Sequence, residues 1–160
     1  FLILNLIILC LFSARTFVRI LDWQNGLKLY SHDIQISQNA FDLENNYGVE
    51  LYRNQKFTEA KVHFEKSTVL APHWWTNWNN LGAMYEKEGN LEIAKNLYHK
   101  AIDNGNYYLA FQNYGAILIK LQKYNEAKFF LEQEALARFP QNQILIAQYL
   151  YLQKLQNQVE

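Results

Sequence analysis

Three short stretches of this 160-residue chain decide its fold: NNYGVEL at 45–51, NNLGAMY at 79–85 and QNYGAIL at 112–118. Their glycines recur at spacings of 34 and then 33 residues. Twelve residues after each glycine stands an alanine, and four residues later a large apolar side chain; the pairs are Ala60 with Phe64, Ala94 with Tyr98, and Ala127 with Leu131. A fixed period of this length predicts an array of repeated structural units.

The composition and the spacing within each unit predict a pair of helices. Glycine (6 residues) and proline (2) are scarce and 50% of the residues are hydrophobic, which favours helices over a turn-rich all-β chain. Small residues such as Gly82 and Ala94 let two antiparallel helices approach closely. Because one helix pair leaves an apolar face bare, successive pairs must stack into a superhelix with a concave groove. We therefore predict an all-α solenoid, in which a leucine at position 82 would overpack the helix crossing.

The units resemble the tetratricopeptide repeat (TPR), whose pattern is W-x2-L-G-x2-Y followed by A-x3-F. The second copy, residues 75–107, matches best and carries Trp78, Leu81, Gly82, Tyr85, Ala94, Tyr98 and Ala101. The first copy, 41–74, has Glu44 where the family has tryptophan. Together the three copies cover residues 41–140, and the resemblance implies a helix-turn-helix solenoid that binds other proteins.

The third copy, 108–141, departs from the family pattern near its end. The segment from Leu131 to Ala135 is one residue longer than in the other copies. This insertion predicts a local bulge or a shifted helix before Pro140.

Helices are also predicted on both sides of the array. One repeat period before Ala60 and Phe64 stand Gly26 and Tyr30, so residues 15–40 are interpreted as a juxtamembrane helix that includes a degenerate half repeat. Residues 142–160 are predicted to form a capping helix. Its expected inward residues are Ile146, Tyr149 and Leu150, and its expected outward residues are Gln148, Gln153, Lys154 and Gln156.

Residues 1–14, FLILNLIILCLFSA, carry no charge. A membrane-spanning helix needs about 20 such residues, so we interpret this run as the end of a transmembrane helix. The alternative is the core of a signal peptide, since Phe12-Ser13-Ala14 ends in small residues as cleavage sites do. The few basic residues that follow, Arg15, Arg19 and Lys28, weakly favour a cytoplasmic position for the rest of the chain.

Charge and residue types exclude several classes of function. Fifteen basic residues balance fifteen acidic ones without a basic stripe, which argues against nucleic-acid binding. The single cysteine, Cys10, excludes an internal disulfide and a cysteine-based zinc site. The four histidines show no metal-ligand spacing, and no phosphate loop or nucleophile motif is present. We therefore predict no catalytic residue, no metal and no cofactor.

Paired amides recur before the glycine of each repeat and are the first candidate site. They are Asn45 with Asn46, Asn79 with Asn80, and Gln112 with Asn113. A side-chain amide offers one acceptor and two donors, so it can hold the N–H and C=O of an extended peptide. The arrangement resembles the asparagine ladder on the inner face of TPR superhelices such as O-GlcNAc transferase. The alternative is that these amides satisfy only local backbone groups.

The chaperone-binding branch of the family grips a terminal carboxylate with lysine and arginine. The matching places here hold Asn45, Val49, Leu109 and Asn113, and only Asn80 agrees with that clamp. Binding of heat-shock chaperone tails is therefore not expected.

Aromatic residues where one repeat meets the next are the second candidate site. Trp74 with Trp75, and Tyr107 with Tyr108, occupy corresponding places. Such rings form either an exposed platform that stacks on sugars or aromatic ligands, or a core between helices, and the second is the more common arrangement.

These features lead to two hypotheses of function. In the first, the chain is a membrane-tethered TPR module that binds an extended segment of a partner protein in its groove. In the second, it is the acceptor-presenting tail of a multi-spanning glycosyltransferase. The second rests on a resemblance to O-mannosyltransferase-like TPR proteins in WWTNWNNLG at 74–82 and GNYY at 105–108, and it implies an extracytoplasmic array and catalytic residues outside this sequence. A purely structural scaffold that self-associates is a third possibility.

Overall fold

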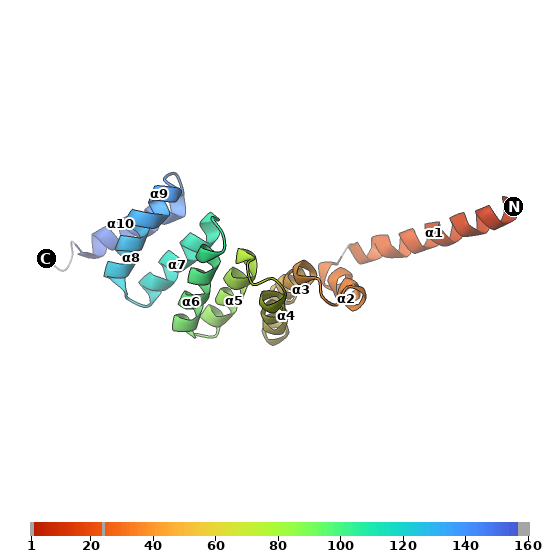
Figure 1. The fold of residues 1–160 in the computed structure, drawn as a ribbon, viewed down its shortest axis with the longest axis horizontal. Coiled ribbons are helices and arrows are strands. Elements are labelled where there is room, and N and C mark those ends of the chain that lie inside the picture. Colours follow the sequence, from red (N-terminus) through yellow and green to blue (C-terminus); the bar gives the residue numbers. More distant parts are fainter. Residues whose placement is uncertain (1, 24, 157–160) are drawn as a thin grey trace. The chain divides into compact units, whose positions relative to one another are not determined.

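The computed structural model describes residues 2–23 and 25–156, and the regular structure in this part of the chain is helical (Figure 1). The chain forms two compact units, residues 1–63 and 64–160, and each is described by itself. The helices of the first unit are α1 (Leu2–Trp23), α2 (Gly26–Ile36), α3 (Phe41–Arg53) and the start of α4 (Phe57–Leu70). After the end of α4, the second unit contains α5 (Trp75–Lys87), α6 (Leu91–Asp103), α7 (Tyr108–Lys120), α8 (Tyr124–Phe130), a π-helical turn (Leu131–Ala135), α9 (Leu136–Arg138) and α10 (Gln143–Gln156).

Helices of the second unit pack in chain order, α5 on α6, α6 on α7 and α7 on α8. The predicted small residues lie where α5 and α6 approach. Ala94 is completely buried, and a Cβ added to Gly82 would lie only 2.8 Å from Cδ1 of Tyr98. The tyrosine ring therefore covers the glycine directly, and the predicted all-α stack of helix pairs is confirmed.

The third repeat contains the bulge that its length predicts. After α8 the chain forms a π-helical turn at Leu131–Ala135, and such a turn accommodates one residue more than an α-helical turn. Leu131 and Ala135, four residues apart, are both completely buried, as are Tyr98 and Ala101, which are three residues apart in the second repeat. The extra residue is thus absorbed without turning the apolar face away from the core.

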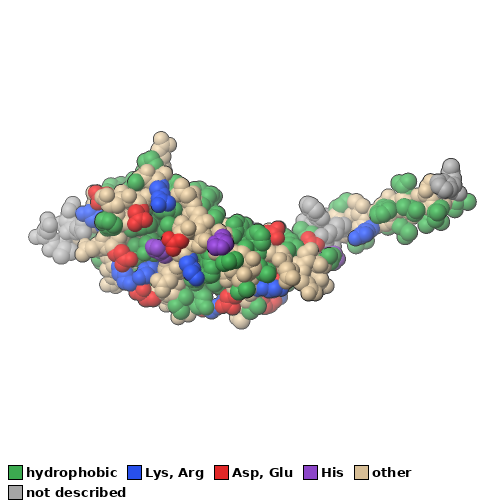
Figure 2. Space-filling model, viewed as in Figure 1, with side chains coloured by type: hydrophobic (Ala, Val, Ile, Leu, Met, Phe, Trp, Pro, Cys, Tyr) green, Lys and Arg blue, Asp and Glu red, His purple; other side chains and the backbone are tan. Residues whose placement is uncertain are grey.

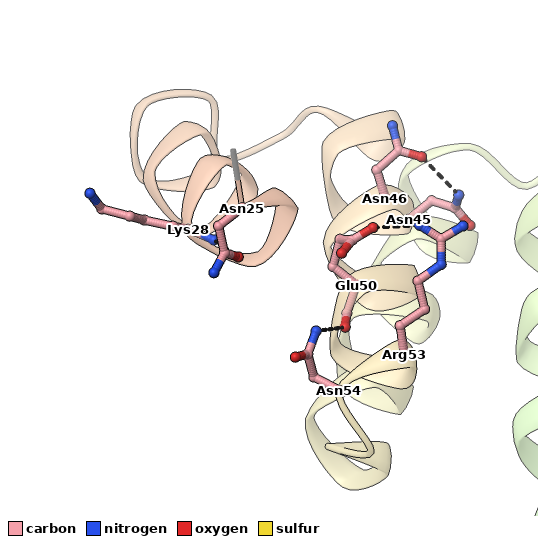
Figure 3. Close-up of polar contacts among 7 residues, drawn as sticks. All are labelled: Asn25, Lys28, Asn45, Asn46, Glu50, Arg53 and Asn54. Carbon is pink, nitrogen blue, oxygen red and sulfur yellow. Dashed lines mark hydrogen bonds and ion pairs between the residues drawn. The ribbon is translucent and has the colours of Figure 1, made fainter. Parts of the chain in front are cut away.

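In the first unit, α2 packs against α3 through the glycine that the repeat period picks out. A Cβ added to Gly26 would lie 2.7 Å from Cδ of Glu50. The helix begins at Asn25, whose Oδ1 accepts a hydrogen bond from the backbone N–H of Lys28 at 3.3 Å (Figure 3). An asparagine at this position satisfies a backbone donor that the first turn leaves without a partner.

The apolar start of the chain lies in α1, which continues past residue 14 without a break. The expected limit between residues 1–14 and 15–40 therefore falls inside one helix. Large apolar side chains are exposed along it, from Ile8 at 42% to Ile3 at 75% (Figure 2). Within the described residues, no helix combines the length and the apolar character that a membrane span requires.

The predicted capping helix forms as α10, and its inward face agrees only in part with the expected one. Tyr149 packs against the core and Ile146 is half-buried. The fully buried residues are Leu145 and Leu152, whereas Leu150, which was expected to point inward, is 56% exposed. Apolar residues lie on every side of this helix, so their spacing does not define one buried face. The packing of α10 on α7, α8 and the π-helical turn decides the face instead.

The polar residues of α10 correct the prediction in a second way. Gln148 was expected to point outward, but it is half-buried and its Nε2 donates a hydrogen bond to the backbone oxygen of Gln112 at 2.9 Å. Lys154 is exposed, as predicted. The side chain of Gln156 and residues 157–160 lie outside the described part of the chain.

Candidate functional site

The predicted amides fall into two groups with different surroundings. The inner amides, Asn45, Asn79 and Gln112, are buried, with exposed fractions of 3%, 3% and 7%. The outer amides, Asn46, Asn80 and Asn113, are half-buried. Each outer amide follows an inner one directly, so one step along each first helix separates an internal position from one that solvent reaches.

In the second unit, a hydrogen bond joins an outer amide to an inner amide of the preceding repeat. Nδ2 of Asn113 on α7 donates to Oδ1 of Asn79 on α5 at 2.9 Å. The amides of neighbouring first helices are therefore in register. Since an amide nitrogen carries two hydrogens and its oxygen two lone pairs, this bond uses only part of the capacity of Asn113.

In the first unit, the corresponding pair is on α3 (Figure 3). Nδ2 of Asn45 donates to Oδ1 of Asn46 at 3.4 Å. One turn further along the helix, Arg53 donates to Oε1 of Glu50 at 2.7 Å. The buried amide thus holds the outer one in place on the same helix.

The row of amides in the second unit extends further than the sequence pattern indicates. Nε2 of Gln112 donates to Oδ1 of Asn142 at 2.8 Å, and Gln148 of α10 bonds to the backbone of Gln112. Asn142 belongs to no repeat motif. Gln148 stands at the place of Asn113 only when the extra residue of the π-helical turn is added to the 34-residue period, and this allowance was the signal that could have found it.

Charged side chains in the last turns of α5 and α7 form an ion pair with each other. In the last turns of α5 and α7, Oε1 of Glu86 lies 3.4 Å from Nζ of Lys120. Oε2 of the same carboxylate accepts a hydrogen bond from the hydroxyl of Tyr98 at 2.7 Å. These opposite charges therefore pair with each other at the ends of α5 and α7.

The aromatic residues at the repeat junction stack mainly on one another. Tyr107 lies between Trp75 and Tyr108, with ring centroids 4.5 Å away on either side. Trp75 also packs on Gly105, where an added Cβ would lie 2.6 Å from the ring. Trp74 is half-buried just before α5. The rings therefore stack on one another at the junction, while Tyr107 and Tyr108 each remain 40% exposed.

Two polar groups that the sequence patterns did not single out as a site organise the start of the second repeat. Asn77 is completely buried; its Oδ1 accepts from the hydroxyl of Ser67 at 2.8 Å, and its Nδ2 donates to the backbone oxygens of Ser67 and Ala71. The indole N–H of Trp78 donates to the backbone oxygen of Pro72 at 2.7 Å. Both side chains tie α5 to the loop that precedes it.

The departure of the first repeat from the family pattern has a local explanation. Glu44, at the tryptophan position, is completely buried, and its Oε2 lies 2.7 Å from Nδ1 of His63 on α4. The ring of Tyr47 packs edge-on against His63 at 4.6 Å. A buried carboxylate requires such a partner. The contact with His63 therefore explains how a glutamate can occupy the position where the family has tryptophan.

Among the ionisable side chains near the amides, Tyr114 has the most strongly shifted pKa. Burial, reinforced by the nearby carboxylates of Glu126, Glu134 and Asp103, raises its pKa to about 12. Its hydroxyl donates to Oε1 of Glu126 at 3.3 Å. At neutral pH it is a protonated hydrogen-bond donor inside the core. Among the described residues, no group of three or more potential ligand side chains is placed to hold a metal ion.

Comparison with known proteins now identifies the repeats. The family model described as tetratricopeptide repeat matches residues 76–104 and 108–133. These two segments therefore match the tetratricopeptide repeat family. The chain is also 34% identical over 65 residues to the tetratricopeptide repeat domain-containing protein PYG7, chloroplastic, of Arabidopsis thaliana. That match covers 41% of this chain and only 22% of PYG7.

Solved structures support the same fold. The Arabidopsis OM64 TPR domain has a TM-score of 0.65 at 21% identity, covering 72% of this chain and 95% of that one. YrrB, described as a TPR protein with an unusual peptide-binding site, has a TM-score of 0.66 at 20% identity, covering 75% and 62%. The first TPR of Spaghetti (RPAP3), bound to an HSP90 peptide, has a TM-score of 0.67 at 20% identity, covering 73% and 93%. At these identities the likeness establishes a TPR helical solenoid.

Proposed function

We propose that this chain is a protein-interaction module whose TPR groove binds an extended, uncharged peptide segment through the outer amides. The observation that carries the proposal is the hydrogen bond from Asn113 to Asn79, which aligns the amides of successive first helices. Two solved TPR relatives of similar fold are described as bound to peptides, from HSP70 and from HSP90.

The chemistry of the site favours recognition of backbone over side chains. The outer amides are half-buried, so they retain contact with solvent, and Asn46 and Asn113 are each hydrogen-bonded to an inner amide. An amide matches one peptide group, and a row of amides matches a strand-like segment. The absence of lysine and arginine at the clamp positions Asn45, Val49, Leu109 and Asn113 argues against a carboxylate-terminated chaperone tail as the ligand.

The expected affinity is modest. Each backbone hydrogen bond contributes about 1 kcal/mol net, so loss of the two made by Asn80 and Asn113 should weaken binding about thirtyfold. Recognition in the micromolar range suits an adaptor that releases its partner.

The test begins with linear peptides selected from a random library on the wild-type chain. A variant that combines Asn80→Ala and Asn113→Ala should bind the selected peptides about thirtyfold more weakly by calorimetry. The matched control replaces Asn96 and Asn125, which are exposed on second helices, and should bind normally. N-methylation of the peptide backbone should abolish binding. Unchanged affinity of this double variant, with normal helicity, would exclude the amide row of the second unit.

We also propose that α1 tethers the module to a membrane. Its support is the exposed apolar surface of this helix, which water tolerates poorly. Flotation with phospholipid vesicles tests this, with an Ile7→Lys, Leu11→Lys variant as the comparison. Equal flotation of the two chains, or none of the wild type, would contradict it.

Under the glycosyltransferase hypothesis, the same groove binds an extended segment of the acceptor protein. It differs in requiring a catalytic region outside this sequence. The reading frame that precedes Phe1 distinguishes it from an adaptor, because several further apolar spans would favour the enzyme tail.

A further inference from the structure

Helix α10 follows the register of α7 once the extra residue of the π-helical turn is allowed for. One period of 34 residues plus that residue leads from Ala110 and Ile117 of α7 to Leu145 and Leu152 of α10. All four side chains are buried, with exposed fractions of 0% or 1%. The helix therefore packs with the register of a first helix of a repeat.

The same shift leads from the outer amide Asn113 to Gln148, and the hydrogen bonds agree with this correspondence. Asn113 on α7 donates to Oδ1 of Asn79, the inner amide of α5, at 2.9 Å. Gln148 on α10 donates to the backbone oxygen of Gln112, the inner amide residue of α7, also at 2.9 Å. Gln148 therefore occupies the place of an outer amide next to Asn113.

A separate residue, Asn142, holds α10 in this register. Its Oδ1 accepts a hydrogen bond from Nε2 of Gln112 at 2.8 Å, and bonds from the backbone N–H groups of Ile144 and Leu145 at 3.2 Å each. One side-chain oxygen thus joins the first turn of α10 to the buried amide of α7. Because Asn142 fixes the helix, the side chain of Gln148 can change its conformation while α10 stays in place.

One atom of Gln148 is not satisfied by these contacts. Its Oε1 is buried and has no hydrogen-bond partner among the residues that the structure describes. It lies over Gly115, where an added Cβ would be only 2.6 Å from it, and the Cα of a glycine offers only a weak C–H donor. Since a buried acceptor without a partner destabilises a folded chain, this inward conformation is less stable than one in which Oε1 accepts an N–H.

We propose that Gln148 is a third peptide-binding amide of the second unit, and that its side chain turns from Gly115 towards the proposed groove when a peptide binds. In the turned conformation Oε1 accepts a backbone N–H of the peptide, and Nε2 leaves Gln112 to donate to a peptide carbonyl. Glutamine has one more rotatable bond than asparagine, which gives the side chain the reach for this turn. The inference rests on the proposed function, because it adds a residue to the same amide row.

The third amide lengthens the segment that the groove recognises. Helices that pack on each other lie about 8–10 Å apart, and α10 packs on α7. An extended chain rises about 3.3 Å per residue. Gln148 therefore adds about three residues to the peptide segment that the outer amides of α5 and α7 bind.

Single N-methyl groups on the peptide backbone test the contact position by position. A peptide selected on the wild-type chain is methylated at one nitrogen at a time, and its affinities for the wild type and for Gln148→Leu are compared by calorimetry. Leucine is close to glutamine in size and keeps Gly115 covered, but its side chain makes no hydrogen bond. At one nitrogen, methylation should weaken binding to the wild type about fivefold more than binding to Gln148→Leu. That nitrogen should lie about three residues from the one whose methylation loses its effect in Asn113→Ala.

The matched control is Gln143→Leu, the same change at an exposed glutamine of α10, which should respond to every methyl group as the wild type does. Suppose that every methyl group has the same effect on the wild type and on Gln148→Leu, while the Asn80→Ala, Asn113→Ala variant binds weakly. This result would refute the role of Gln148 and leave the proposed function standing. Normal binding by that double variant would refute both.

Nuclear magnetic resonance of the wild-type chain gives a second readout that does not depend on the folding of a variant. The side-chain resonances of Gln148 are assigned through its own backbone amide. In the free chain they should show a nuclear Overhauser contact with the α-protons of Gly115, and saturating peptide should abolish this contact and shift the side-chain amide signals. A contact that persists in the complex, with unshifted amide signals, would overturn the proposed turn of Gln148.

Discussion

The second and third repeats solve the same packing problem in different ways. In α5 and α6, one rigid side chain, Tyr98, covers Gly82 and donates its hydroxyl to Glu86. In the third repeat, Leu131 takes the corresponding place, and Gly115 is covered jointly by Leu131 and by Gln148 from α10. The glycine is the same, but its cover is a fixed ring in one repeat and two flexible side-chain ends in the other.

The two repeats also differ in their second helices. α6 is a regular α-helix, whereas α8 passes through a π-helical turn before α9. The difference shows that the two repeats bury the same side of the second helix even though the number of residues in that helix differs. A residue can be added where the helix can widen locally, provided that the residues on either side return to the core.

The largest expected effect comes from single-residue deletions at matched exposed positions. Deleting Asn96 from α6 would rotate Tyr98 and Ala101 out of the core by about 100°, and we expect a loss of about 4 kcal/mol or more in unfolding free energy. Deleting Gln133 should convert the π-helical turn into regular α-helix and lower the unfolding free energy by less than about 1.5 kcal/mol. The loss is small because Ala135 then stays on the buried side of the helix. Urea unfolding followed by circular dichroism measures both; equal losses would show that the turn is not what absorbs the extra residue.

Replacing Gly82 and Gly115 tests whether the side chains packed over each glycine determine the cost of a larger residue there. Gly82→Leu forces the buried ring of Tyr98 to move and should cost about 3 kcal/mol. Gly115→Leu meets Oε1 of Gln148 at 2.6 Å and Cδ2 of Leu131 at 3.0 Å from the first added carbon, and these ends can shift, so we expect a loss of about 1 kcal/mol. Ala116→Leu, at an exposed position on α7, is the control. A larger loss at Gly115 than at Gly82 would reverse the interpretation.

The smallest expected effect concerns pH and the carboxylates around the third repeat. Because folding raises the pKa of Tyr114 to about 12, its neutral form is favoured in the folded chain. This contribution is fully present below the unfolded pKa of about 10 and is lost as the pH rises through 12. After screening by water we expect about 1 kcal/mol. The wild type should lose stability more steeply than Tyr114→Phe in urea unfolding across this alkaline range, and parallel curves would contradict the assignment.

Several features of the fold could be predicted from particular residues. The close approach at Gly82 and Ala94 follows from the recurrence of small residues, and the bulge follows from the extra residue between Leu131 and Ala135. Such features depend on chain spacing and on side-chain volume, both of which can be read directly in a sequence.

Other features could not be predicted because they depend on neighbours far along the chain. Asn79 and Asn80 are adjacent and have the same side chain, yet one is buried and bonded to Asn113 while the other is half-buried. The reversal of Leu150 and Gln148 on α10 has the same origin. No local pattern distinguishes these positions, because an amide can be satisfied equally by protein or by water.

The sequence by itself determined the helical repeat, its period, its close helix crossings and the position of the extra residue. Only the tertiary structure decided which amides are internal, which face of α10 is exposed, and that the rings of Trp75, Tyr107 and Tyr108 stack on one another. The physical reason is that helix formation and close approach depend on residues within one period. Burial of a given side chain depends instead on the free energy of its contacts with whichever helix packs against it.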